Sequence, residues 1–110
     1  MPRVLLYGDS NTFGTAPMEA PGSEAVHARG VRWGDGLAQA LGTDWDVVIE
    51  GLPGRTTVYD DPVEGAFRNG LTILPAILHS HKPIDLLVIC LGTNDQKKRF
   101  GLVAEDVAEG

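Results

Sequence analysis

The chain has 110 residues, 43% of them hydrophobic and 22% charged, which is the composition of one soluble globular domain. Nine basic residues against fifteen acidic ones give a net charge of −6, which disfavours nucleic acid and anionic membranes as partners. The longest apolar run, residues 86–91, is far shorter than the roughly 20 residues that cross a bilayer. A single cysteine, Cys90, cannot form an intrachain disulfide, so we expect a cytoplasmic location.

Three short apolar runs predict β-strands at residues 3–7, 45–50 and 84–91. Two of them are rich in Val, Ile and Leu without strict alternation, which indicates strands of a parallel sheet with both faces covered.

Two helices are predicted between these strands. The segment "VRWGDGLAQALG" has an apolar residue every four positions (Trp33, Leu37, Leu41) and ends at Gly42, a typical C-cap. The segment "NGLTILPAILHSH" also has one apolar face. Because proline is tolerated only in a first turn or at a kink, we expect this helix to begin near Thr72 or to bend at Pro75.

This alternation of strands and helices predicts an α/β fold, namely a flavodoxin-like, three-layer α/β/α arrangement around a parallel sheet. The last residues, "VAEDVAEG", begin a helix that stops after about two turns. The third strand is apolar on both faces and has too few predicted neighbours to cover it. We therefore expect residues 1–110 to be the N-terminal part of a single larger domain.

A small, polar, glycine-containing turn follows each predicted strand: "GDSNT" at 8–12, "GLPGRTT" at 51–57 and "LGTND" at 91–95. In open α/β sheets, ligands bind at the carboxyl ends of the strands. We therefore expect these three turns to form one site.

The three turns carry groups suited to nucleophilic catalysis. A serine hydroxyl such as that of Ser10 attacks carbonyl carbon once a base accepts its proton. The resulting oxyanion needs fixed hydrogen-bond donors. Gly54 offers a backbone N–H that no Cβ shields, and Asn94 offers a side-chain amide.

These motifs resemble those of the SGNH hydrolases, the GDSL-type esterases and lipases, and most of all their arylesterase branch. Ser10 matches the family's nucleophile, and Gly54 and Asn94 match its glycine and asparagine. The resemblance implies an oxyanion hole formed by Ser10, Gly54 and Asn94, with no cofactor. It also implies a serine esterase for aryl or short-chain acyl esters, with acyl transfer to alcohols or peroxide in some members, and a homo-oligomer.

The sequence departs from the family pattern at two points. Asn11 replaces the leucine of the nominal GDSL motif, which we expect to be harmless. The family's Asp-x-x-His block, which supplies the general base, occurs nowhere in the 110 residues. We therefore expect the base beyond residue 110, and we expect the 110 residues alone to be nearly inactive.

Each candidate also has a structural interpretation. Ser10 could be only a helix N-cap, and Gly54 only a turn glycine after a proline. Phe13 could form a wall of the acyl pocket or pack in the core. Arg55 and Thr56 could contact substrate, or could form a loop salt bridge and a helix cap.

The remaining polar residues suggest structural roles. His79 and His81 fall at the end of the second helix, where imidazoles interact favourably with the helix dipole. His27 lies within a long loop and has no carboxylate at a diagnostic spacing. Cys90 is expected to be a small buried side chain. Because no His, Cys, Asp or Glu grouping has metal-ligand spacing, we predict no metal site.

Two acidic residues and one long loop complete the set. Asp9 is expected to bond local amides in its turn, and Asp95 to hold the loop that orients Asn94. The loop 58–67 is expected to line the alcohol side of the cleft or to contact another subunit.

A flavodoxin-like domain that binds a phosphate or flavin at "GDSNT", without hydrolase activity, remains the alternative function.

Overall fold

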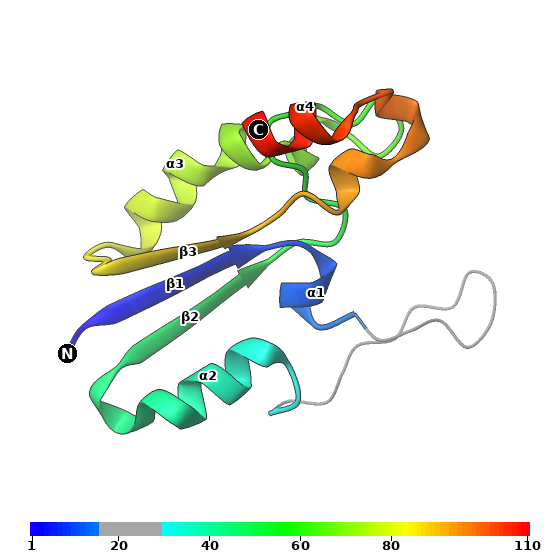
Figure 1. Ribbon diagram of the computed structural model, residues 1–110. Coiled ribbons are helices and arrows are strands. Elements are labelled where there is room, and N and C mark those ends of the chain that lie inside the picture. Colours follow the sequence, from blue (N-terminus) through cyan, green and yellow to red (C-terminus); the bar gives the residue numbers. More distant parts are fainter. Residues whose placement is uncertain (16–29) are drawn as a thin grey trace.

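A three-stranded parallel sheet forms the centre of the computed structural model, which describes residues 1–15 and 30–110 (Figure 1). The strands are β1 (Arg3–Gly8), β2 (Asp46–Gly51) and β3 (Leu86–Cys90), in the order β2-β1-β3. Both strand pairs are parallel. The predicted strands and the parallel sheet are thus confirmed, with ends that differ by one or two residues.

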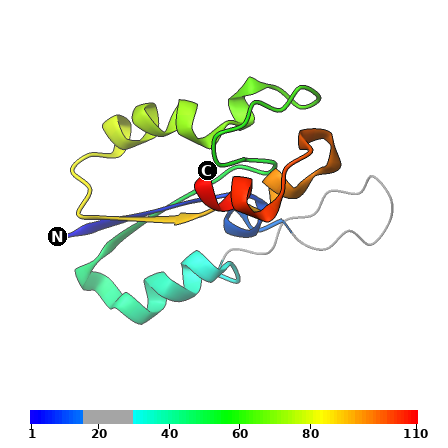
Figure 2. The ribbon, with the colours of Figure 1, turned by 45° about the horizontal axis from the view of Figure 1, so that its top comes forward.

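The two predicted helices cover opposite faces of this sheet. Helix α2 (Trp33–Leu41) lies on one face and α3 (Gly70–His81) on the other (Figures 1 and 2). Helix α2 ends at Gly42, as predicted. Helix α3 begins two residues before the predicted Thr72, because the side chain of Asn69 accepts the N–H groups of Leu71 and Thr72. The N-cap thus fixes the start of this helix, and Pro75 falls inside it.

Six shorter helical segments follow the strands or connect the larger elements. They are the α-helices α1 (Ser10–Phe13) and α4 (Ala104–Glu109) and the 3-10 helices η1 (Gly42–Asp44), η2 (Ala66–Arg68), η3 (Asn94–Gln96) and η4 (Lys98–Phe100). Among the described residues, none of the helices has both the length and the apolar character needed to cross a bilayer.

The core is centred on β1, which is the middle strand. Its consecutive residues Val4, Leu5, Leu6 and Tyr7 are each at most 1% exposed. Strand β3 lies at an edge, and its residues Leu86 and Ile89 are about half exposed. Cys90 is also exposed, so the prediction that it is buried is wrong. Cys90 is exposed because β3 is an edge strand: within the part of the chain that the structure describes, only β1 pairs with it.

Gly51 lies in close contact with the backbone of α1, and we expect a side chain there to destabilise the fold. A Cβ at Gly51 would lie 2.2 Å from the backbone nitrogen of Phe13 and 2.6 Å from its Cα. Because backbone atoms cannot rotate aside, we expect Gly51→Ala to lower the free energy of unfolding by about 1–3 kcal/mol, measured by urea denaturation.

Gly36 in α2 is the matched control for this change, because a Cβ there meets no atom within 4 Å. Gly36→Ala is expected to raise the free energy of unfolding by up to about 1 kcal/mol through helix propensity. A Gly51→Ala protein that unfolds at the same urea concentration as the wild type would contradict the packing described for α1.

Candidate active site

The register of the sheet brings the three polar turns to one edge. Gly8, the last residue of β1, pairs with Gly51 of β2 and with Cys90 of β3, so the three carboxyl ends are level. Because β2 and β3 flank β1, the strand order reverses here, and ligands of open α/β sheets bind at such a point. The turns that follow the three strands therefore start side by side, as the sequence predicts.

The first turn places Ser10 at the start of α1. The N-cap of this helix is Asp9, whose carboxylate accepts the N–H of Asn11 at 3.0 Å. The interpretation of Ser10 as the N-cap is therefore wrong, and the predicted turn role of Asp9 is confirmed. As the first helical residue, Ser10 has a backbone N–H without an acceptor in its own helix.

The second turn holds Gly54 in a left-handed conformation. The N–H of Arg55 donates to the carbonyl of Leu52 at 3.1 Å, and Gly54 has a φ of +80° within this turn. A non-glycine residue would be strained at that φ. The N–H of Gly54 donates to no acceptor among the described residues, so Gly54 is a turn glycine and also leaves a donor free.

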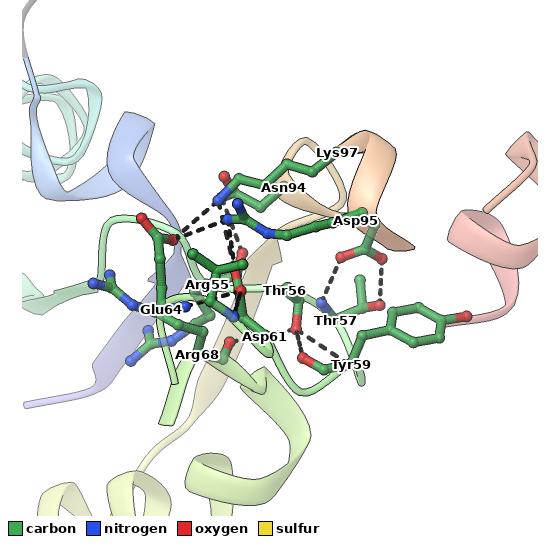
Figure 3. A network of polar contacts seen from close by, with 12 residues as sticks. Arg55, Thr56, Thr57, Tyr59, Asp61, Glu64, Arg68, Asn94, Asp95 and Lys97 are labelled. Carbon is green, nitrogen blue, oxygen red and sulfur yellow. Dashed lines mark hydrogen bonds and ion pairs between the residues drawn. The ribbon is translucent and has the colours of Figure 1, made fainter. Parts of the chain in front are cut away.

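Hydrogen bonds join the three turns. The carbonyl of Gly8 accepts the N–H of Leu52 and the Nη1 of Arg55, each at 3.1 Å, which ties the second turn to the end of β1. The amide Nδ2 of Asn94 donates to the carbonyl of Arg55 at 3.1 Å, which ties the third turn to the second (Figure 3). One N–H of that amide is thus occupied, and its second N–H has no acceptor among the described residues.

Asp95 fastens the third turn to the second from inside the protein. Its side chain is fully buried and accepts the backbone N–H of Thr57 at 2.9 Å and the Thr57 hydroxyl at 2.5 Å (Figure 3). The predicted role of Asp95, holding the loop that orients Asn94, agrees with these contacts.

Arg55 is an internal residue, which corrects the prediction that it contacts substrate. It is only 2% exposed, and its guanidinium lies 4.0 Å from the centre of the Tyr7 ring. It also forms an ion pair with Glu50 at 3.5 Å. The side chain is thus held beneath the second turn, and the loop salt bridge is the alternative that the structure shows.

The other candidates have mixed outcomes. Phe13 is 38% exposed, so its interpretation as a core residue is wrong, while its role as an acyl-pocket wall stays a prediction. The Thr56 hydroxyl donates to the carbonyl of Tyr59 at 2.6 Å and so closes a local turn, not a helix cap. His79 and His81 lie in the last turn of α3, as predicted.

His27 and most of the loop 15–30 lie outside the described residues, which leave out 16–29. Within the described residues, no group of three or more His, Cys, Asp and Glu side chains is placed to hold a metal ion.

A pocket of about 380 Å³ lies against α1; the chain neighbours of Ser10 line it, but Ser10 itself does not. It is lined by residues of α1, α2, the end of β3 and the turn that follows β3, which are Asp9, Asn11, Thr12, Trp33, Cys90, Leu91 and Thr93. Trp33 is fixed in this wall, because its indole N–H donates to the hydroxyl of Thr12 at 3.2 Å. The pocket can accommodate a small organic group next to the Ser10 turn.

A cluster of four charged side chains, which sequence reasoning missed, connects the loop after Gly54 to the loop after Asn94. Asp61 and Glu64 belong to the first loop, and Lys97 and Arg99 to the second. The shortest ion pair of this cluster, Arg99 Nη2 to Asp61 Oδ2, measures 2.8 Å. The partners are more than 30 positions apart, so no local sequence pattern indicates the pairing.

Asp61 should make the stability of the fold depend on acid pH. Burial by itself raises the pKa of Asp61, but the N–H groups of Glu64 and Val63 and the Arg99 guanidinium together lower it to about 2. A carboxyl whose pKa is lower in the folded state stabilises the fold above its unfolded pKa, near 4. We therefore expect stability to fall as the pH drops from about 4 to about 2.

The measurement is urea denaturation at a series of acid pH values, with Asp61→Asn as the variant. The variant should be less stable than the wild type at neutral pH, and the difference should shrink towards pH 2. Asp44, which is exposed and forms no ion pair within the described residues, provides the control Asp44→Asn. A difference for Asp61→Asn that stays constant over this range would contradict the lowered pKa.

Comparisons with known proteins agree with this arrangement. A model of the GDSL-like lipase/acylhydrolase family matches residues 6–108. An aryl esterase from M. smegmatis is 44% identical with a TM-score of 0.94, and Est24, a carbohydrate acetylesterase from Sinorhizobium meliloti, is 39% identical with a TM-score of 0.94. A putative arylesterase from Agrobacterium tumefaciens is 42% identical with a TM-score of 0.86.

Each of these structures matches 99% of this chain, while the chain spans 50% of theirs, so it has about half their length. A search of curated proteins found no match. The family model matches nearly all of the sequence, and the fold and the three converging turns agree with it. The chain therefore belongs to the GDSL-like lipase/acylhydrolase family.

Proposed function

We propose that this chain supplies the nucleophile and the oxyanion-hole donors of a serine esterase. In this mechanism the Oγ of Ser10 attacks the ester carbonyl, an acyl-enzyme forms as the alcohol leaves, and water or another acceptor releases the acid. The observation that carries the proposal is the joining of the three turns by the hydrogen bonds that Gly8 and Arg55 make.

The oxyanion would be stabilised by three donors that are already fixed before the substrate arrives. The N–H groups of Ser10 and Gly54 have no acceptor from their own helix or turn, and one N–H of the Asn94 amide is free among the described residues. Donors held in place by the fold need no reorganisation when charge develops on the carbonyl oxygen, and this is how they lower the barrier.

The proposed mechanism also needs a general base, because a serine hydroxyl is a weak nucleophile at neutral pH. The 110 residues contain no Asp-x-x-His motif. We propose that the base comes from polypeptide outside these residues, so that the 110 residues alone bind and polarise an ester but turn it over very slowly.

The substrates that we propose are small aryl or short-chain acyl esters. Two considerations support this choice: the pocket lined by the chain neighbours of Ser10 has the size for a small group, and the similar structures are called aryl esterase and carbohydrate acetylesterase. The acyl acceptor, a homo-oligomeric assembly and the cytoplasmic location stay predictions.

Labelling with a fluorophosphonate tests the proposal. The reagent should add covalently to Ser10 in a protein that joins these residues to the base, and mass spectrometry of peptides locates the adduct. The exposed Ser80 of α3 serves as an internal control that should stay unlabelled. An unlabelled Ser10 together with no hydrolysis of p-nitrophenyl acetate would refute the esterase, and a bound flavin would favour the alternative function.

A further inference from the structure

Arg68, at the end of the 3-10 helix η2, carries a polar group that the proposed function does not explain. Its Nε is buried and has no hydrogen-bond partner, and no carboxylate of the described residues lies within ion-pair distance of its guanidinium. A guanidinium carries five N–H donors and stays charged at every physiological pH. A partly buried cation without an acceptor calls for an explanation, because such groups are normally paired.

The neighbouring charges do not neutralise Arg68. Two acidic and two basic side chains make up the adjacent cluster of Asp61, Glu64, Lys97 and Arg99, so that cluster has no net charge. Arg55 is likewise paired, with Glu50. Among the described residues, Arg68 is therefore a positive charge beside the second turn that no carboxylate pairs with.

The position of Arg68 relates it directly to the proposed oxyanion hole. A Cβ built on Gly54 would lie 3.1 Å from the Nη1 of Arg68 and 3.3 Å from its Cδ. Two bond lengths separate that Cβ from the Gly54 nitrogen, so Nη1 lies within about 6 Å of the proposed oxyanion donor. Figure 3 shows Arg68 beside Glu64 and below Arg55, at the margin of the polar network.

The side chain is also held in place and lies near the surface. Its guanidinium carbon lies 4.6 Å from the centre of the Phe67 ring, and Phe67 is 49% exposed. The Oε2 of Glu64 would lie 2.9 Å from the same Cβ on Gly54, but it pairs with Lys97 at 3.1 Å and with Arg99 at 3.5 Å and lies beyond ion-pair distance of Arg68. A stacked guanidinium keeps its N–H groups in a fixed plane, which suits two parallel hydrogen bonds to a carboxylate.

We propose, on the basis of the esterase function proposed above, that Arg68 is a specificity residue that binds a carboxylate on the ester substrate. The preferred substrates would then be small esters that carry a carboxylate a few bonds away from the scissile bond. Arg68 would not take part in the chemical step, but would position the substrate next to Gly54.

NMR titration of the ¹⁵N-labelled chain with benzoate tests the binding without requiring turnover. Because Nε is buried, benzoate should bind the Nη groups of Arg68 and so produce saturable shifts at the adjacent Nε–H and at the N–H of Gly54. Benzamide, which has the same ring without the charge, should not. Arg68→Gln should weaken benzoate binding at least about tenfold, the typical effect of losing a charge-assisted hydrogen bond. Arg68→Lys, which keeps the charge but not the planar fork, should weaken it by less.

Lys82→Gln is the matched control, because it removes the same charge at the opposite end of the sheet, just after α3. It should leave benzoate binding unchanged. Benzoate that causes no saturable shift in the wild type, or that binds Arg68→Gln and wild type equally, would overturn the proposal. Should Arg68→Gln not fold, the wild-type titration and Arg68→Lys still decide the question.

A kinetic comparison in a protein that also contains the base extends the test to turnover. The ratio of kcat/KM for 4-acetoxybenzoate to that for phenyl acetate should fall at least about tenfold in Arg68→Gln. Fluorophosphonate labelling of Ser10 without benzoate binding would refute the role of Arg68 and leave the esterase intact. Benzoate binding without labelling of Ser10 would refute the esterase and leave the binding of a carboxylate by Arg68 intact.

Discussion

Replacing Ser10 by alanine is expected to lower kcat for p-nitrophenyl acetate by about 10⁶-fold in a protein that joins these residues to the base, because no acyl-enzyme can then form. The affinity for substrate should change little, since the proposed oxyanion donors of Gly54 and Asn94 stay in place. Ser10 begins α1 while Asp9 caps it, so the loss of the Ser10 hydroxyl removes no capping bond. The fold should therefore be unaffected.

The comparison is made by steady-state kinetics, with circular dichroism to verify folding. Ser80→Ala is the control, because Ser80 is an exposed residue of α3 whose hydroxyl bonds only the carbonyl of Ile77 among the described residues. It should retain full activity. A Ser10→Ala protein that keeps more than a small fraction of the wild-type kcat would show that another group is the nucleophile.

Replacing Asn94 by alanine is expected to lower kcat by about 10²–10³-fold, which is the usual effect of removing one oxyanion donor. The structure supports a large value, because the Asn94 amide is fixed by its bond to the carbonyl of Arg55. The donor is thus preorganised, and its loss also removes one of the bonds between the second and third turns, which Asp95 and Thr57 continue to join. The main effect should fall on kcat, since the oxyanion exists only in the transition state and the intermediate.

Gln96→Ala is the control for this variant, because Gln96 is an exposed amide on the same 3-10 helix, η3. Its activity should equal that of the wild type. Asn94→Asp should resemble Asn94→Ala, since a carboxylate has the size of the amide but no N–H to donate. If Asn94→Ala instead raised KM and left kcat unchanged, Asn94 would be a substrate-binding residue outside the oxyanion hole.

The sequence by itself determined the elements of the sheet and the edge of the sheet at which the three turns meet. Runs of Val, Ile and Leu predicted β1, β2 and β3 to within two residues, and the spacing of apolar residues together with Gly42 predicted α2. These signals are local, because hydrophobic period and turn chemistry act over a few residues. The convergence of the three turns also followed, because parallel strands place their carboxyl ends on one edge.

Contacts between distant segments could not be predicted in this way. The sequence "GLPGRTT" left open whether Arg55 contacts substrate or forms a loop salt bridge, whereas the stacking on Tyr7 and the pairing with Glu50 place its side chain inside. Likewise, the apolar sequence around Cys90 suggested burial, whereas the order β2-β1-β3 puts its strand at an edge. The exposure of a strand depends on which strands lie next to it, and no single segment of the sequence determines the strand order.

The polar connections between the turns were also decided by the tertiary structure alone. The bonds of Asp95 to Thr57 and of Asn94 to the carbonyl of Arg55 join residues 38 and 39 positions apart. The residues next to an Asp or Asn in the sequence do not show whether its side chain will bond water or a buried hydroxyl. Local sequence therefore determined which chemical groups the three turns carry, and the packing of the turns determined which of these groups keep a free hydrogen-bond donor.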